Sequence, residues 1–155
     1  MNVIEFRLRQ ERPDVAPAWV TITPFIDGVD LRDLVRPVEL PFAEEEGSPG
    51  LAGSYAGIGA DADTRWPGRH YLDAPTDQWF EDGDTRVLAC GGCGESGCWD
   101  LTARVEVDED AVTWSGFRMG HRDWDLRALG PFQFDRKQYE DALRESALPG
   151  RAANT

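Results

Sequence analysis

The chain has 155 residues, of which 41% are hydrophobic and 10% aromatic, and this content is enough for one domain with a buried core. The longest uncharged stretch, residues 47–60, is rich in glycine and serine, so no membrane span is expected, because a span needs about 18 or more apolar residues. With 16 basic and 29 acidic residues, the net charge of −13 disfavours nucleic acid as a ligand.

The first predicted elements are two strands and a tight turn. Apolar and charged side chains alternate over residues 3–9, and this period of two predicts a strand with one buried face. A secretory signal would be apolar in this region, so we expect a cytoplasmic protein. Residues 19–26 form a second predicted strand, in which Pro24 indicates an edge or the end of pairing. The dipeptide Asp27-Gly28 then predicts a hairpin.

A short helical turn and a long loop are expected next. Asp30 is a suitable N-cap for a helical turn over residues 31–35. Periodicity is then lost over residues 41–68, which contain six glycines and three prolines. Because connections of this length in other proteins are functional or mobile, we expect a long Gly-rich loop here.

The clearest strand signals lie between residues 85 and 117. Residues 85–89 form a short predicted strand, and residues 99–107 alternate apolar and polar side chains over nine positions. A turn at residues 108–110 leads to a third strand over residues 112–117. Because the connections between these strands are short, we expect an antiparallel meander.

The C-terminal segment predicts a helix with a defined start. Asp135 as N-cap and Gln138 three residues later match a capping box, and Phe134 and Tyr139 match a hydrophobic staple. Pro149-Gly150 ends the helical pattern.

Together these elements predict an α+β fold. It has a mainly antiparallel β-sheet meander, a C-terminal helix packed on that sheet and the long Gly-rich loop. Residues 1–150 are expected to form a single domain, with residues 151–155 as a flexible C-terminal tail.

Three cysteines, Cys90, Cys93 and Cys98, lie within nine residues between two predicted strands. In a reducing compartment such cysteines are free or metal-bound thiols. The Cys-x-x-Cys-Gly pattern resembles half of a zinc knuckle, and structural zinc takes four ligands, so His121 is the first candidate to complete the site. Other candidates for the fourth ligand are His70, Asp100 and Glu95. The alternative is that the cysteines are small buried thiols in a glycine-rich loop.

Two segments place a histidine beside an arginine, namely Arg69-His70 and His121-Arg122, and Trp124 follows the second. An imidazole next to a guanidinium can bind an anion or act as a base, so these five residues are candidate binding residues. The alternative is that each arginine pairs with a carboxylate and the tryptophan belongs to the core. No nucleophile elbow, phosphate-binding loop or deaminase motif is present in the sequence, so no catalytic residue is assigned.

Several segments resemble a set of small acidic bacterial proteins of unassigned function. These segments are CGESGCW at 93–99, HRDW at 121–124, GPFQFDRKQY at 130–139 and LAGSYAG at 51–57. The resemblance implies one domain and a bacterial cytosolic setting, and it carries no activity.

Two functions remain open. The first is a non-enzymatic protein-binding module for a basic partner, since complementary charge speeds encounter; an immunity- or antitoxin-like protein is a specific version of it. An acidic surface also has the simpler role of keeping a small protein soluble. The second function is a small zinc-dependent hydrolase, in which Cys90, Cys93 and Cys98 hold a zinc ion with a bound water.

Overall fold

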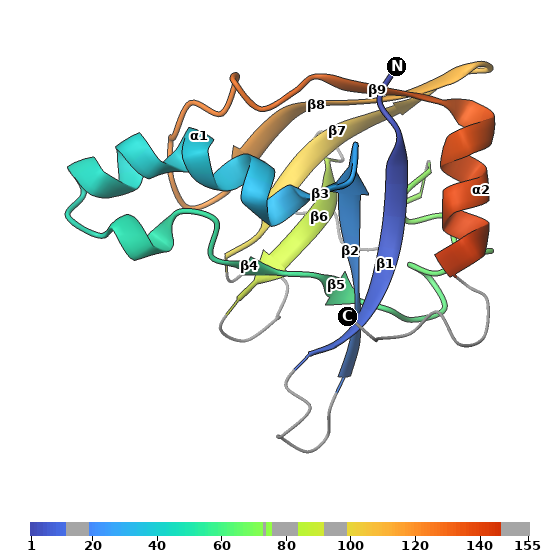
Figure 1. Cartoon of the computed structure of the whole chain (residues 1–155), viewed down its shortest axis with the longest axis horizontal. Helices are drawn as coiled ribbons and strands as arrows, with labels where there is room; N and C mark the ends of the chain where they lie inside the picture. The colour runs from blue at the N-terminus through green and yellow to red at the C-terminus, as the bar shows by residue number, and fades with distance from the viewer. Residues whose placement is uncertain (12–18, 73, 76–83, 92–98, 147–155) are drawn as a thin grey trace.

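The computed structural model describes residues 1–11, 19–72, 74–75, 84–91 and 99–146 (Figure 1). Within these residues the strands form two antiparallel sheets, and two helices pack on them. The predicted α+β fold, with its mainly antiparallel sheet and its C-terminal helix, is therefore confirmed. Neither helix in the described part of the chain is long and apolar enough to cross a membrane.

The first sheet is built on an N-terminal hairpin. Strands β1 (Ile4–Glu11) and β2 (Trp19–Ile26) pair antiparallel along their whole length. Strand β2 then turns through Asp27 and Gly28 into the short strand β3 (Val29–Asp30). Both turn residues have a positive φ, 53° and 82°, which is the backbone of a type I′ turn. The predicted hairpin is confirmed.

Pro24 does not mark the end of pairing, which corrects the sequence-based expectation. Strand β2 lies between β1 on one side and both β3 and β5 (Ile58–Gly59) on the other. Pro24 pairs with Phe6 of β1, and on the opposite side it lies between the residues that pair with β5 and those that pair with β3. The proline is tolerated inside a central strand because neither β5 nor β3 pairs with it on that side, so this side of β2 is locally an edge.

The second sheet has five strands in the order β4 (Tyr55–Ala56), β6 (Thr85–Cys90), β7 (Leu101–Val107), β8 (Ala111–Met119) and β9 (Phe132–Asp135). Strands β6, β7 and β8 are the predicted antiparallel meander. Strand β9 was not predicted, because only four residues separate its start from the helix that follows.

The two sheets are joined at both sides. On one side the backbone N–H of Asn2 donates to the carbonyl of Gln133 at 2.8 Å, and Asn2 forms a bridge with Phe134 of β9. On the other side β4 pairs with β6 and β5 pairs with β2, and only Gly57 separates β4 from β5. The strands therefore form a closed circuit around one hydrophobic core, joined by hydrogen bonding at Asn2 and by the chain itself at Gly57.

Gly57 lies where the chain passes from one sheet to the other. A Cβ atom at this position would lie 2.7 Å from the carbonyl oxygen of Ile22. It would also lie 2.6 Å and 2.9 Å from the hydroxyl oxygens of Thr23 and Thr21. Only glycine lets the backbone approach β2 this closely, which explains one of the glycines in the segment that lacked periodicity.

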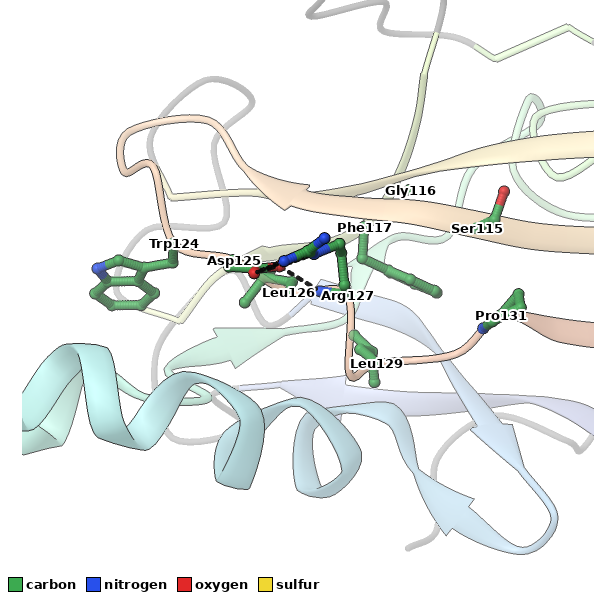
Figure 2. A pocket seen from close by; sticks show the side chains of 9 residues that line it. All are labelled: Ser115, Gly116, Phe117, Trp124, Asp125, Leu126, Arg127, Leu129 and Pro131. Carbon is green, nitrogen blue, oxygen red and sulfur yellow. Dashed lines mark hydrogen bonds and ion pairs between the residues drawn. The ribbon is translucent and has the colours of Figure 1, made fainter.

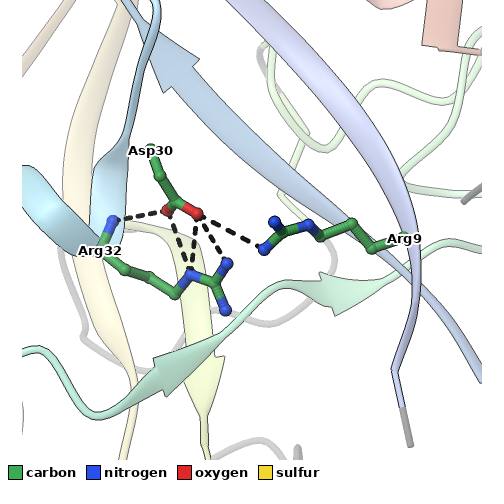
Figure 3. Close-up of polar contacts among 3 residues, drawn as sticks. All are labelled: Arg9, Asp30 and Arg32. Carbon is green, nitrogen blue, oxygen red and sulfur yellow. Dashed lines mark hydrogen bonds and ion pairs between the residues drawn. The ribbon is translucent and has the colours of Figure 1, made fainter. Parts of the chain in front are cut away.

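Helix α1 (Leu31–Glu45) begins as the sequence predicts. The carboxylate of Asp30 accepts a hydrogen bond from the backbone N–H of Arg32 at 2.9 Å. The same carboxylate pairs with the guanidinium groups of Arg32 and Arg9, at 2.6 Å and 3.5 Å (Figure 3). Asp30 is thus the N-cap and also ties the start of α1 to β1.

The length of α1 differs from the expected short turn. The helix continues through Pro37 and Pro41 as far as Glu45. Each proline removes one backbone donor, but a buried stripe stabilises the helix across both positions. The residues of this stripe are Leu31, Val35, Glu39 and Ala43. The Gly-rich connection therefore begins only after α1, and it contains a 3-10 turn (Pro49–Leu51), β4 and β5.

Helix α2 (Arg136–Ser146) packs against β1, β8 and β9. The carboxylate of Asp135 accepts from the backbone N–H of Gln138 at 3.1 Å, so the predicted N-cap is confirmed. The side chain of Gln138 does not complete a capping box. Instead it accepts from the N–H of Ile4 at 3.1 Å and donates to the carbonyl of Ile4 at 2.6 Å, which fastens α2 to β1.

Aromatic side chains fill the core beneath α2. The rings of Phe134 and Tyr139 lie 5.6 Å apart, which confirms the predicted staple. The indole N–H of Trp114 donates to the Tyr139 hydroxyl at 3.1 Å, and that hydroxyl donates to the carbonyl of Tyr71 at 2.5 Å. These hydrogen bonds satisfy polar groups that the core encloses completely.

Candidate functional site

The Arg69-His70 pair does not form one exposed site. The ring of His70 is 1% exposed, and its Nε2 lies 2.8 Å from the carbonyl oxygen of Arg86. Because a carbonyl only accepts, Nε2 carries the proton in this contact. The side chain of Arg69 lies on the surface, so the two side chains face different environments.

The candidate zinc ligands are only partly described. Cys90 is half-buried at the end of β6, where it pairs with Tyr55 of β4. Cys93 and Cys98 lie outside the described residues. Within the described ranges no three His, Cys, Asp or Glu side chains are grouped so that they would hold a metal ion. The zinc site therefore stays a prediction.

The turn after β8 lies against the C-terminal end of α1, and aromatic rings from three segments meet there. The ring of Trp124 stacks on Phe42 of α1 with 6.2 Å between centroids and an interplanar angle of 17°. The ring of Trp99 meets Trp124 edge-on at 6.0 Å and stacks on His121 at 6.5 Å. We call these four residues, Phe42, Trp99, His121 and Trp124, the aromatic surface.

Glu46 connects the aromatic surface to Arg122. Its carboxylate accepts from the indole N–H of Trp124 at 2.8 Å and from Nε of Arg122 at 3.0 Å and 3.1 Å. The guanidinium carbon of Arg122 lies 5.1 Å from the centroid of the Trp99 ring. The hydrogen bond from Trp124, followed by that from Arg122, holds the pKa of Glu46 below its ordinary value. The carboxylate is thus ionised and fixed at neutral pH.

The aromatic surface is partly open to solvent. Trp99 and Trp124 are half-buried, whereas His121 is exposed. The side chains of Arg122 and Glu46 are 37% and 34% exposed to solvent, respectively. The indole N–H of Trp99 is enclosed and donates no hydrogen bond within the part of the chain that the structure describes.

A buried carboxylate holds α1 in place beneath this surface. Glu39 accepts from the hydroxyl of Tyr55 at 2.5 Å and from the backbone N–H of Gly53 at 2.8 Å. Desolvation raises the pKa of Glu39, and burial beside this carboxylate raises the pKa of Tyr55. Because Glu46 is the C-cap of α1 and follows Glu39 by about two helical turns, these contacts also help to position the carboxylate of Glu46.

A tight turn holds the second part of the surface. The backbone N–H of His121 donates to the sulfur of Met119 at 3.2 Å, and that of Arg122 donates to the Met119 carbonyl at 3.2 Å. Met119 is itself buried at the end of β8. Hydrogen bonds to buried residues therefore hold both parts of the aromatic surface, the end of α1 and this turn.

The charge around the aromatic surface is negative. The last residues of α1, its C-cap and the turn at residues 121–127 carry five carboxylates and two guanidiniums, which leaves three negative charges. The acidic residues are Glu44, Glu45, Glu46, Asp123 and Asp125, and the basic ones are Arg122 and Arg127. A cation approaching this surface is therefore attracted.

A cavity of about 360 Å³ adjoins the surface, with Trp124 and Pro131 at its opposite ends (Figure 2). Leu126 and Leu129 contribute apolar lining, and the ion pair between Asp125 and Arg127 also belongs to the lining. This lining suits an apolar side chain.

The structure brings the predicted residues His121, Arg122 and Trp124 together with three residues that were not predicted as part of the site: Phe42, Glu46 and Trp99. Phe42 was assigned to a loop and Trp99 to an ordinary strand position, so no local pattern connected them. Comparisons of the chain with protein-family models, curated proteins and solved structures find no match.

Proposed function

We propose that the protein is a non-enzymatic protein-binding module that contacts a basic partner through the aromatic surface and Glu46. The observation that carries this proposal is the pair of half-exposed tryptophans, Trp99 and Trp124, which contact each other beside the carboxylate of Glu46. Tryptophan is among the residue types that contribute most to binding energy in protein interfaces.

The rigidity of the surface favours binding. Ordering one flexible side chain at an interface costs about 0.5–1.5 kcal/mol. Here Glu46 already accepts a hydrogen bond from Trp124, and the rings of Phe42 and Trp99 contact Trp124. Much of this cost is therefore met when the protein folds, before any partner arrives.

The charge supports a basic partner. The whole chain has a net charge of −13, and the region around the aromatic surface carries three excess negative charges. Complementary charge raises the association rate and disfavours acidic competitors. A partner that presents lysine or arginine side chains would meet both the rings and the carboxylates.

Selection from a random dodecapeptide display library tests the proposal. We expect the selected peptides to be rich in lysine and arginine and to shift the backbone amide resonances of residues 42–46 and 121–124. Trp124→Ala should weaken binding by about tenfold or more, which is the effect of removing an interface hot spot.

Trp66→Ala is the matched control, since Trp66 is also half-buried and also lies beneath an arginine, Arg144, at 4.7 Å. Peptides that bind Trp124→Ala as tightly as the native protein, or that lack an excess of basic residues, would overturn the proposal.

A further inference from the structure

We propose that the face of Trp99 and the carboxylate of Glu46 form a receptor for a guanidinium or alkylammonium group, and that Arg122 occupies this receptor until a partner displaces it. The inference rests on the proposed function for the partner itself. It adds the chemistry that the partner must present, namely an arginine or lysine side chain, and a contact within the chain that restrains binding.

An aromatic ring, a carboxylate and a backbone carbonyl surround the guanidinium of Arg122, and each of them stabilises a bound cation. The Trp99 ring offers its electron-rich face, with the guanidinium carbon 5.1 Å from the ring centroid. Glu46 supplies a carboxylate 3.0 Å from Nε, and the carbonyl of His121 accepts from Nη1 at 3.0 Å. A guanidinium from another chain would find the ring and the carboxylate in the same arrangement, because contacts with other residues also hold both of them.

The position of Glu46 is secured by other contacts. Its carboxylate accepts from the indole N–H of Trp124 at 2.8 Å, and its helix is anchored by the buried carboxylate of Glu39. Trp99 in turn contacts the rings of Trp124 and His121. Loss of the Arg122 side chain would therefore leave the receptor formed and empty.

Arg122 is held weakly enough to be displaced. Its side chain is 37% exposed, and ion pairs and cation–π contacts at exposed sites contribute little, since water and salt screen them. The guanidinium nonetheless competes effectively with a single free cation, because it belongs to the same chain. A partner with several basic side chains gains from the surrounding carboxylates as well, so the contact selects for such partners.

Two other arginines show which features matter. Arg127 pairs with Asp125 at 2.8 Å, but its side chain is 91% exposed and no aromatic contact is found for it within the described residues. Arg144 lies over Trp66 at 4.7 Å, but its carboxylate partner Asp141 belongs to its own helix and also pairs with Lys137. Only the site at Trp99 combines a ring with a carboxylate that a second tryptophan fixes, as far as the described residues show.

The test measures binding of N-acetyl-arginine methylamide to the native protein and to Arg122→Ala, by tryptophan fluorescence and by the shifts of the tryptophan indole resonances. We expect Arg122→Ala to bind the probe about tenfold more tightly than the native protein, because the competing guanidinium is gone. Adding Glu46→Gln to this variant should cancel the gain. The neutral analogue N-acetyl-citrulline methylamide should show no gain.

Arg144→Ala is the matched control, since it uncovers Trp66 in the same way. An equal gain in Arg144→Ala, no gain in Arg122→Ala with its thermal stability retained, or a gain that survives Glu46→Gln would each overturn the receptor. The proposed function has a separate readout. Selected peptides whose binding depends on Trp124 would support the proposed function even if Arg122→Ala binds the probe no more tightly than the native protein. If no such peptides are selected, the proposed function is wrong even if the probe binds.

Discussion

Replacing Gly57 with alanine tests whether the closed circuit of strands stabilises the protein. The added Cβ atom would lie 2.6, 2.7 and 2.9 Å from three oxygens of β2, and each of these distances is shorter than real Cβ contacts. The two threonine hydroxyls can move by rotation of their side chains. The carbonyl of Ile22 cannot, because it is part of the strand that pairs with β5. The backbone must therefore shift, and the pairing of β5 with β2 weakens.

The expected cost follows from this geometry. Forcing an extra carbon into a packed site costs about 1–3 kcal/mol, and the rigid carbonyl places Gly57→Ala near the upper end. For a chain of this size, 1 kcal/mol lowers the melting temperature by about 2–4 °C, so a cost near 3 kcal/mol lowers it by about 6–12 °C.

Thermal unfolding followed by circular dichroism measures this effect. Gly59→Ala is the control, since Gly59 also belongs to β5 and no atom lies within 4 Å of its added Cβ. The control should stay within about 0.5 kcal/mol of the native protein. Equal melting temperatures for the two variants would refute the reasoning, because the crossing at Gly57 would then not be tightly packed.

Three further predictions concern a core hydroxyl, a buried carboxylate and the cysteines. Tyr139→Phe leaves the buried N–H of Trp114 without its acceptor, so we expect a loss of about 1–3 kcal/mol in denaturant unfolding, and an unchanged midpoint would contradict it. Burial raises the pKa of Glu39, so the folded state favours the protonated acid and this contribution to stability falls as pH rises above the ordinary value of 4.5. Glu39→Gln should remove this part of the pH dependence, and the stability of the variant relative to the native protein should increase from acid to neutral pH; a constant difference would count against it. The zinc hypothesis predicts about one zinc per chain by elemental analysis, lost in Cys98→Ala, and metal-free native protein would end it.

The sequence predicted those parts of the fold that depend on neighbouring residues. Alternation over residues 3–9 and 99–107 located two strands, and Asp27-Gly28 located the hairpin, because a turn with two positive φ angles needs these residue types. The caps at Asp30 and Asp135 were also predicted locally, because an aspartate at this position accepts a hydrogen bond from a backbone N–H two or three residues later.

Features that depend on distant contacts were missed. The two prolines in α1 argue against a helix locally, and only the burial of one helix face overcomes them. The aromatic surface has the same origin, since Glu46 and Trp124 are 78 residues apart and no local pattern connects them. The contiguous half of this site, at residues 121–124, was predicted from the sequence, and the half that folding brings to it was missed.

The bridge between Asn2 and Phe134 has a consequence for the order of assembly during translation. More than 130 residues separate Asn2 from Phe134 along the chain, so the circuit of strands stays open until the ribosome has made β9. Contacts between such distant residues slow folding, because a long loop must close before they form. Until β9 is made, the apolar face of the β1–β2 hairpin is not yet enclosed in the core, so chaperones can bind it.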